Sequence, residues 1–184
     1  MFKRTALTRR TGLKAKTPLK SNGKQDSDKK VVQRKREPNY VADMDKVFQY
    51  WVRLRDAMPG GYTRCISCGQ IKPFDQIQAG HYMSRKHMSI RWNPMNCNGE
   101  CTFDNGYNGD HLIGYRKNLI KKIGEAKVEW LEASSKQAKK WSSFEIMLLI
   151  KHYSKEILQL SASKGIPVSK GVLDIIKRYD KKNL

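Results

Sequence analysis

Four cysteines are the residues of this chain whose spacing points most directly to chemistry. Cys65 and Cys68 are separated by two residues, and Cys97 and Cys101 follow after an interval of 28 residues. Two thiolates at CxxC spacing can grip one tetrahedral ion, and Gly69 allows the backbone to turn beneath the sulfurs. The CxxC…CxxxC frame therefore predicts one structural zinc ion. One or two buried free thiols are the alternative interpretation.

A group of histidines and asparagines surrounds the cysteine pairs. His81 lies between the pairs with Asn96, and Asn105 follows them. An imidazole can take a proton from water, while carboxamide, carboxylate or imidazole groups can hold a divalent ion against a phosphate. The order His–Asn–Asn around a zinc site is typical of HNH (ββα-metal) nucleases. It predicts the catalytic trio His81, Asn96 and Asn105, in which Asn96 ties a loop through its side-chain amide, and metal binding by Asn105 with Asp110 and His111. An ordinary polar residue at a strand end is the alternative for His81.

The charge of the chain indicates a polyanionic partner. There are 37 Lys and Arg against 17 Asp and Glu, a net charge of +20. Residues 1–37 contain 13 of these cations and three acids, a net charge of +10, which is half of the total. We expect this segment to be a disordered basic arm that contacts DNA phosphates, with a solubilising tail as the alternative.

The elements that must position these residues can be placed from their periodicity. Apolar residues at three-to-four spacing predict helices at 38–58, 112–123 and 144–160, and a last amphipathic segment over 172–179. The stretch 77–80 predicts a strand that presents His81. We therefore expect an α+β, mostly helical fold. A basic arm (1–37) would precede a zinc-stapled ββα-metal nuclease domain with flanking helices (38–160) and a basic C-terminal helix or tail (161–184).

Membrane and secretory classes are disfavoured. No apolar run approaches the roughly 18 to 20 residues that a membrane span requires, and the first ten residues lack the apolar stretch of a secretory signal. We expect a cytoplasmic protein without a membrane partner. In that reducing compartment, four cysteines favour metal binding over disulfides.

The sequence resembles the NinG (Rap) family of phage recombination endonucleases. The segments CISCG, AGHY, RWNPMNCNGEC and HLIGYRKNLIKKIG carry this resemblance, which extends over residues 40–160. It implies a structure-specific DNA endonuclease that cleaves Holliday junctions or D-loops, with structural Zn²⁺ and catalytic Mg²⁺ or Mn²⁺. A more distant similarity to phage endonuclease VII junction resolvases implies that His81 matches a catalytic histidine and Asn105 a metal-binding asparagine.

Two positions depart from the family pattern. Asp104 stands where the family usually has a fourth cysteine, so the fourth zinc ligand is either Cys97 or Asp104, and we slightly favour Cys97. Gly80 stands where many HNH enzymes have a metal-binding Asp. The second ligand of the catalytic metal must then come from elsewhere, with three candidates: Asp75, Asp110 and His111.

Two alternatives to a branched-DNA endonuclease stay open. One is a non-catalytic zinc-containing DNA-binding module, and the other is an HNH nuclease that acts on ordinary duplex DNA. Because a junction is nearly two-fold symmetric and needs paired incisions, a homodimer is expected, with the helix at 38–58 or at 144–160 as its interface.

Overall fold

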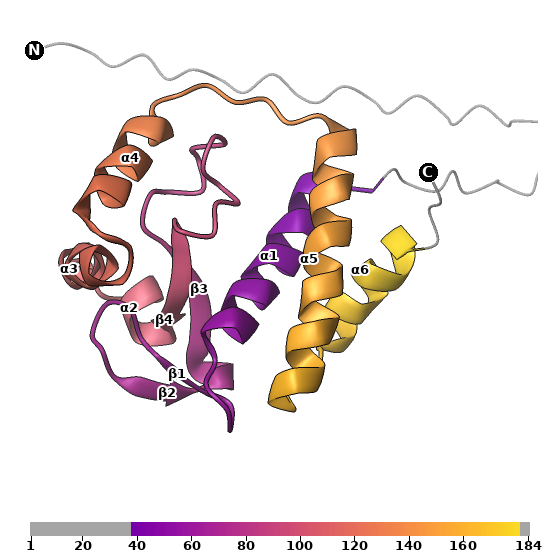
Figure 1. Ribbon diagram of the computed structural model, residues 1–184, viewed down its shortest axis with the longest axis horizontal. Coiled ribbons are helices and arrows are strands. Elements are labelled where there is room, and N and C mark those ends of the chain that lie inside the picture. Colours follow the sequence, from indigo (N-terminus) through magenta and orange to yellow (C-terminus); the bar gives the residue numbers. More distant parts are fainter. Residues whose placement is uncertain (1–37, 181–184) are drawn as a thin grey trace, which may run out of the picture. The chain divides into compact units, whose positions relative to one another are not determined.

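The computed structural model describes residues 38–180, and all structural statements here concern those residues. They form a mostly helical α+β domain with two small antiparallel sheets (Figure 1). The helices are α1 (Tyr40–Asp56), α2 (Thr102–Gly106), α3 (His111–Ile123), α4 (Glu125–Ser135), α5 (Ser143–Lys164) and α6 (Lys170–Asp180). The strands are β1 (Tyr62–Arg64), β2 (Ile71–Pro73), β3 (Ile77–His81) and β4 (Cys97–Cys101), with a one-turn 3-10 helix at Phe74–Gln76. The predicted arm at 1–37 lies outside the described residues.

Helix α1 is the central element of the domain. It contacts α5 and α6 on one side and both strands of the β3–β4 hairpin on the other (Figure 1). The side chain of Asn39 accepts a hydrogen bond from the backbone N–H of Ala42, which caps the first turn. The helix predicted at 38–58 is thus confirmed within two residues at each end.

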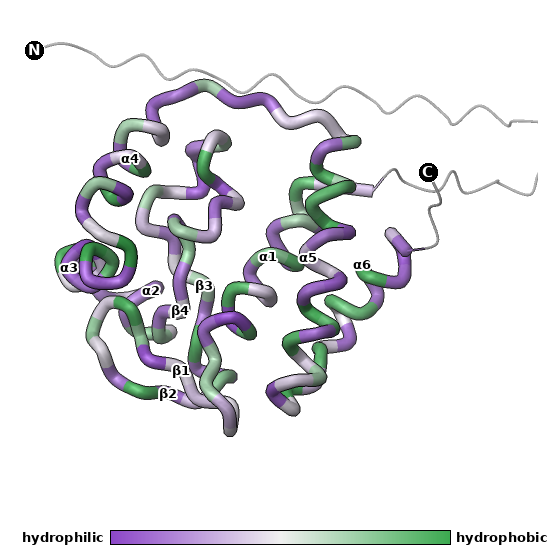
Figure 2. The backbone as a smooth tube through the Cα atoms, in the orientation of Figure 1, coloured by the Kyte–Doolittle hydropathy of each residue, from purple (hydrophilic) through white to green (hydrophobic). Residues whose placement is uncertain are grey.

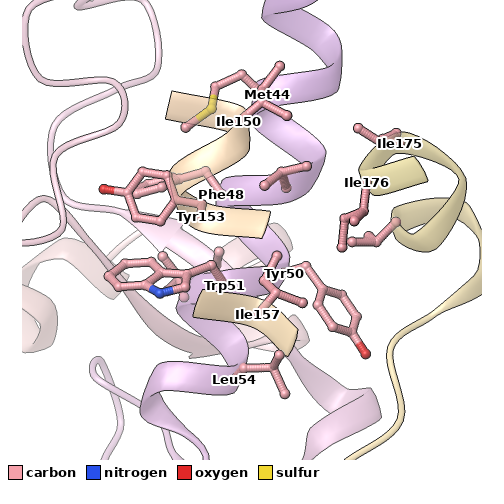
Figure 3. Close-up of a cluster of buried hydrophobic side chains, with 14 of the residues drawn as sticks. Met44, Phe48, Tyr50, Trp51, Leu54, Ile150, Tyr153, Ile157, Ile175 and Ile176 are labelled. Carbon is pink, nitrogen blue, oxygen red and sulfur yellow. The ribbon is translucent and has the colours of Figure 1, made fainter. Parts of the chain in front are cut away.

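The main hydrophobic core lies between α1, α5 and α6, where apolar positions of the three helices face one another (Figure 2). Phe48 and Trp51 of α1 pack against Tyr153 of α5, with ring centroids 5.2 and 4.7 Å apart (Figure 3). Ile175 and Ile176 of α6 belong to the same core. The last amphipathic segment therefore docks onto the domain rather than extending from it as a tail.

The two hairpins differ in role. The β1–β2 hairpin pairs Tyr62 with Pro73 and carries the CxxC segment in its turn. The β3–β4 hairpin pairs Ile77 with Cys101 and His81 with Cys97, and all of β4 is buried. The strand predicted to present His81 is confirmed as β3.

Helices α3 and α4 pack together over the opposite side of the β3–β4 hairpin and form a second, smaller core (Figure 1). Helix α3 ends at Ile123, as predicted, and Gly124 (φ +88°) caps it. Helix α4 was not predicted, because its few apolar residues do not form a stripe along one face. Val128 and Leu131 are buried, whereas Trp130 is half exposed. None of the helices within residues 38–180 is both long enough and apolar enough to cross a membrane.

Candidate functional site: a metal cluster beside a basic cavity

Three cysteines and one aspartate converge at the base of the two hairpins. Cys65 and Cys68 lie in the β1–β2 turn, Cys101 ends β4, and Asp104 lies in the first turn of α2. Their ligand atoms all lie within 4.8 Å of one another. Oδ2 of Asp104 is 3.1 Å from the sulfurs of Cys65 and Cys101, and the sulfurs of Cys68 and Cys101 are 4.0 Å apart.

This donor set fits a structural zinc ion. A tetrahedral ion at about 2.3 Å from sulfur and about 2.1 Å from oxygen holds its ligand atoms about 3.5 to 3.8 Å apart. The turn brings Cys65 and Cys68 together, because Gly69 adopts φ +75° and its N–H donates a hydrogen bond to the Cys65 carbonyl. The backbone N–H of Cys101 points at the Cys65 sulfur at 3.3 Å.

The preference for Cys97 as the fourth ligand is corrected by this geometry. Cys97 opens β4 and Cys101 ends it, so the two are about 13 Å apart at roughly 3.3 Å per strand residue. The Cys97 sulfur is fully buried in the main core, 3.7 Å from Nδ1 of His81. Asp104 occupies the place in the cluster that we assigned to Cys97.

The acid groups of the cluster influence one another. Desolvation of the Cys68 thiol and its hydrogen bond with Asp104 raise its pKa to about 12. Burial opposes ionisation of Asp104, but hydrogen bonds from Asn108 and the neighbouring thiols outweigh it and hold the Asp104 pKa well below its usual value. One carboxylate thus accepts from three thiols, an arrangement in which a cation would take the place of the thiol protons.

His81 lies at the end of β3, half-buried, on the wall of an open cavity. Its Nε2 is 3.1 Å from the carbonyl oxygen of Arg91, which can only accept, so the neutral ring carries its proton on Nε2 and its lone pair on Nδ1, which faces the Cys97 sulfur at 3.7 Å. Burial lowers the pKa of His81 and nearby Arg85 lowers it further, although the Arg91 carbonyl opposes both. The imidazole is therefore neutral near pH 7 and able to accept a proton.

The two asparagines of the trio have different surroundings. Asn96 is fully buried, and its side chain accepts from the N–H of Met83 and donates to the carbonyls of Met83 and Ile90. It therefore ties together the loop between β3 and β4. Asn105 is exposed on α2, and its amide donates to Gln78 Oε1 of β3 at 2.6 Å. The structure brings Asn105, but not Asn96, to the same cavity as His81.

The cavity has a volume of about 920 Å³ and a basic lining. His81, Asn105 and His111 lie on its wall with three cationic residues, Lys46, Arg53 and Arg85. Asp75 and Asp110 are exposed and do not line it, so of the three substitutes considered for the position of Gly80 only His111 reaches the cavity.

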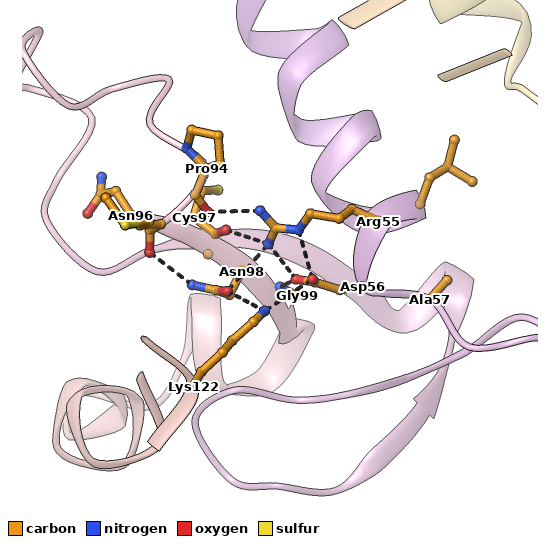
Figure 4. A network of polar contacts seen from close by, with 12 residues as sticks. Arg55, Asp56, Ala57, Pro94, Asn96, Cys97, Asn98, Gly99 and Lys122 are labelled. Atoms are coloured by element: carbon orange, nitrogen blue, oxygen red, sulfur yellow. Dashed lines mark hydrogen bonds and ion pairs between the residues drawn. The ribbon is translucent and has the colours of Figure 1, made fainter. Parts of the chain in front are cut away.

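A network of charges holds β4 in place between α1 and α3 (Figure 4). Asp56 accepts from the N–H of Gly99 at 2.8 Å, and Arg55 donates to the Cys97 carbonyl at 2.8 Å. Lys122 of α3 reaches Asn98 Oδ1 at 2.7 Å. Burial disfavours the charged form of Asp56, but Arg55 and Lys122 overcome this and lower its pKa. The strand that carries Cys101 is thereby fixed relative to both helices.

Sequence reasoning missed one residue of this region. Glu100 of β4 is fully buried, and Oε1 accepts from Nδ1 of His111 at 2.7 Å and from the hydroxyl of Ser67. A glycine inside a strand often marks a close approach, so Gly80 was the available signal.

Together these features define a class: a mostly helical α+β protein with a Cys3Asp candidate metal centre beside a basic cavity. The family follows from comparison with known proteins. The family model described as "Bacteriophage Lambda NinG protein" matches residues 2–163, and the chain belongs to the NinG family.

Individual relatives agree with this assignment. The chain is 27% identical over 124 residues to "Protein ninG" of Salmonella phage P22 and, equally, to that of Escherichia phage lambda. It is 26% identical over 124 residues to the protein of the same name from Escherichia phage 933W. These matches cover 63% of this chain, and the chain spans only about 60% of the length of these relatives. No solved structure matches this chain.

Proposed function

We propose that this chain is a metal-dependent DNA endonuclease that cleaves branched DNA. The observation that carries the proposal is the placement of His81 at the end of β3, with its proton fixed on Nε2 and its cavity shared with Asn105. This placement suits a general base that works next to a metal-binding wall.

Charge and shape support a phosphate substrate. Lys46, Arg53 and Arg85 line the cavity, and cationic side chains at such a site attract the phosphodiester backbone. In the proposed reaction, a water molecule replaces the long contact between Nδ1 of His81 and the Cys97 thiol, and Nδ1 accepts a proton from this water as its oxygen attacks phosphorus. The 3′-oxygen leaves, and the product carries a 5′-phosphate.

The cation proposed for the cavity is a hard divalent ion, Mg²⁺ or Mn²⁺. Phosphate and water oxygens suit such ions, and Asn105 and His111 offer an amide oxygen and an imidazole nitrogen on the wall. When bound, the ion would stabilise charge on the phosphate and the leaving oxygen. The Cys3Asp cluster lies apart from this role and is proposed as structural zinc.

A branched substrate and a homodimer are further parts of the proposal. The apolar face of α1 is covered by α5 and α6 within the chain, which favours α5, the other of the two interfaces that we considered. Helix α5 still exposes Phe144 and Leu148, at 53% and 43% of their surface, and is the remaining candidate. Sedimentation of the wild-type protein against a variant with both residues changed to Ser would test this interface.

The central test is a cleavage assay on a four-way junction and on linear duplex DNA of the same sequence, with and without Mg²⁺. The wild-type protein is compared with His81→Ala and with His152→Ala, whose imidazole lies on the surface of α5 in an ion pair with Glu156. Removal of a general base costs about 10²- to 10⁴-fold in rate. We expect that loss for His81→Ala only, with zinc content and DNA affinity unchanged.

Other outcomes separate the alternatives. Cation-independent binding without any cleavage by the wild-type protein would favour a non-catalytic DNA-binding module. Equal cleavage of junction and linear duplex would favour a nuclease of ordinary duplex DNA. Cleavage of junctions by His81→Ala at the wild-type rate would refute the assignment of this site.

A further inference from the structure

A buried carboxyl group next to the cavity has an oxygen atom that no described neighbour satisfies. Glu100 has no solvent exposure, and within residues 38–180 the one basic side chain within 4.0 Å of its carboxyl group is His111. Oε1 accepts two hydrogen bonds, whereas Oε2 is buried without a hydrogen-bond partner in the described part of the chain. A buried carboxylate is costly unless it is paired, so this position calls for a positive charge close by.

The chain reserves space for this carboxylate. A Cβ atom at position 80 would lie 1.9 Å from Oε2 and 2.8 Å from Cβ of Glu100, so a side chain there would force Glu100 to move. Gly80 does not have a positive φ, so the backbone conformation does not explain the glycine. Gly80 is therefore explained by the space that the Glu100 side chain occupies in the hairpin.

The carboxylate also orients the imidazole of His111. Because Oε1 accepts, Nδ1 of His111 donates, and in the neutral ring the lone pair is then on Nε2, on the other side of the ring from Glu100. His111 lines the cavity together with Asn105. A histidine that binds a metal almost always donates its other ring N–H to a carboxylate or a carbonyl, which fixes the tautomer and raises the basicity of the ligand nitrogen.

We propose that Glu100 is the positioning residue that holds the His111 imidazole, so that its Nε2 can bind the divalent cation proposed for the cavity. Gly80 supports this arrangement, because the absence of a side chain there leaves room for the carboxylate of Glu100 to reach His111. This assignment rests on the proposed function and deepens it, since it names the residue that positions the imidazole ligand of the cation on the cavity wall.

The test measures binding of Mn²⁺ alone to the full-length, zinc-loaded protein, so that it does not depend on cleavage. Electron paramagnetic resonance counts bound Mn²⁺, and NMR of ¹⁵N-labelled histidine reports both the tautomer of His111 and its paramagnetic broadening. Thiolate ligands favour zinc over Mn²⁺, so the Cys3Asp cluster keeps its own ion. The variants are Glu100→Gln, which preserves shape but removes charge, and His111→Ala, with His152→Ala as the matched surface control.

We expect the wild-type protein to show the Nδ1–H tautomer of His111 and broadening of its signals by one Mn²⁺. Loss of an orienting partner typically weakens metal affinity 10- to 100-fold, which is the effect expected for Glu100→Gln, and His111→Ala should weaken it at least as much. His152→Ala should bind as the wild type does. Gly80→Ala, which displaces the carboxylate, should resemble Glu100→Gln.

Two results would overturn the inference. One is a wild-type protein in which Mn²⁺ leaves the His111 signals sharp, a result that needs no variant and so survives any folding defect of Glu100→Gln. The other is a zinc-loaded, folded Glu100→Gln with unchanged Mn²⁺ affinity. Failure of the nuclease proposal looks different, because Mn²⁺ would still bind at His111 while junction cleavage would be absent.

Discussion

Tyr115→Phe is the perturbation whose cost can be worked out most directly from the structure. Tyr115 is fully buried under the β3–β4 hairpin, where its hydroxyl donates to the Gly80 carbonyl at 2.9 Å and accepts from Nδ2 of Asn98 at 3.1 Å. Gly80 and Asn98 are partners across the hairpin. The single phenol thus connects α3 to both strands, one residue before His81.

Phenylalanine keeps the ring and its stacking on Tyr82, at 5.7 Å between centroids, so the change creates no large cavity. It removes these two hydrogen bonds and a longer contact of the hydroxyl with the Asn96 carbonyl at 3.4 Å, all in a fully buried place. Each buried group left unsatisfied costs about 1 to 3 kcal/mol. The Asn98 amide keeps a long contact with the Met95 carbonyl at 3.4 Å, which softens one of the two losses. We therefore expect a loss of about 2 to 4 kcal/mol in the free energy of unfolding.

Equilibrium unfolding in urea, followed by circular dichroism on zinc-loaded protein, measures this loss. In thermal unfolding it corresponds to a Tm lower by roughly 6 to 12 °C for a domain of this size. The matched control is Tyr107→Phe, because Tyr107 is 80% exposed and should be neutral. If both variants unfold at the same urea concentration, the phenol does not support the hairpin and the reasoning is refuted.

Three other predictions follow from the geometry. Asp104→Ala should lose zinc on dialysis, whereas Cys97→Ser should retain one ion per chain, because of these two residues only Asp104 lies in the cluster. Metal analysis of the dialysed proteins measures this, and the reverse pattern would contradict the ligand assignment. Because burial lowers the pKa of His81, the cleavage rate should stay high on acidification to about pH 6.5 and should fall only below that pH, where the imidazole is protonated. A cleavage rate that already falls near pH 7 or higher would refute this assignment of the base. The ammonium of Lys164 donates to three carbonyls at the end of α1 at 2.6 to 2.9 Å, so Lys164→Met should lower the free energy of unfolding by about 1 to 3 kcal/mol. In the same urea titration, Lys155→Met at an exposed position of the same helix should leave it unchanged.

Much of the local structure could be predicted from the sequence because its causes are local. Apolar spacing placed α1 and the stripe of α5, and glycine ended α3 where a positive φ is needed. The CxxC turn follows from two thiols and Gly69, and the alternation over Ile77 to Gly80 predicted the strand that presents His81. In each case the residues that decide lie within a few positions of one another.

The fourth metal ligand required the tertiary structure. Cys97 and Cys101 would be neighbours on a helix, where residues four apart share a face, but in a strand the same spacing extends about 13 Å. The chain changes from strand to helix at Thr102, and a helical turn brings Asp104 back beside Cys101. Which of the two candidates joins the cluster is decided at that junction, and residue spacing alone does not locate it.

The contacts of Glu100 with Gly80 and His111 likewise could not be predicted from the sequence. These residues come from β3, β4 and α3, and their contact depends on the hairpin register and on the docking of α3 against it. Residue types and local periodicity determined which chemistry the chain can offer: thiolates for a metal, an imidazole on a strand end and an excess of cations. Only the packing of distant segments decided which groups meet. Local sequence determines the conformation of residues a few positions apart, whereas contacts between residues far apart in the chain depend on how helices and strands pack.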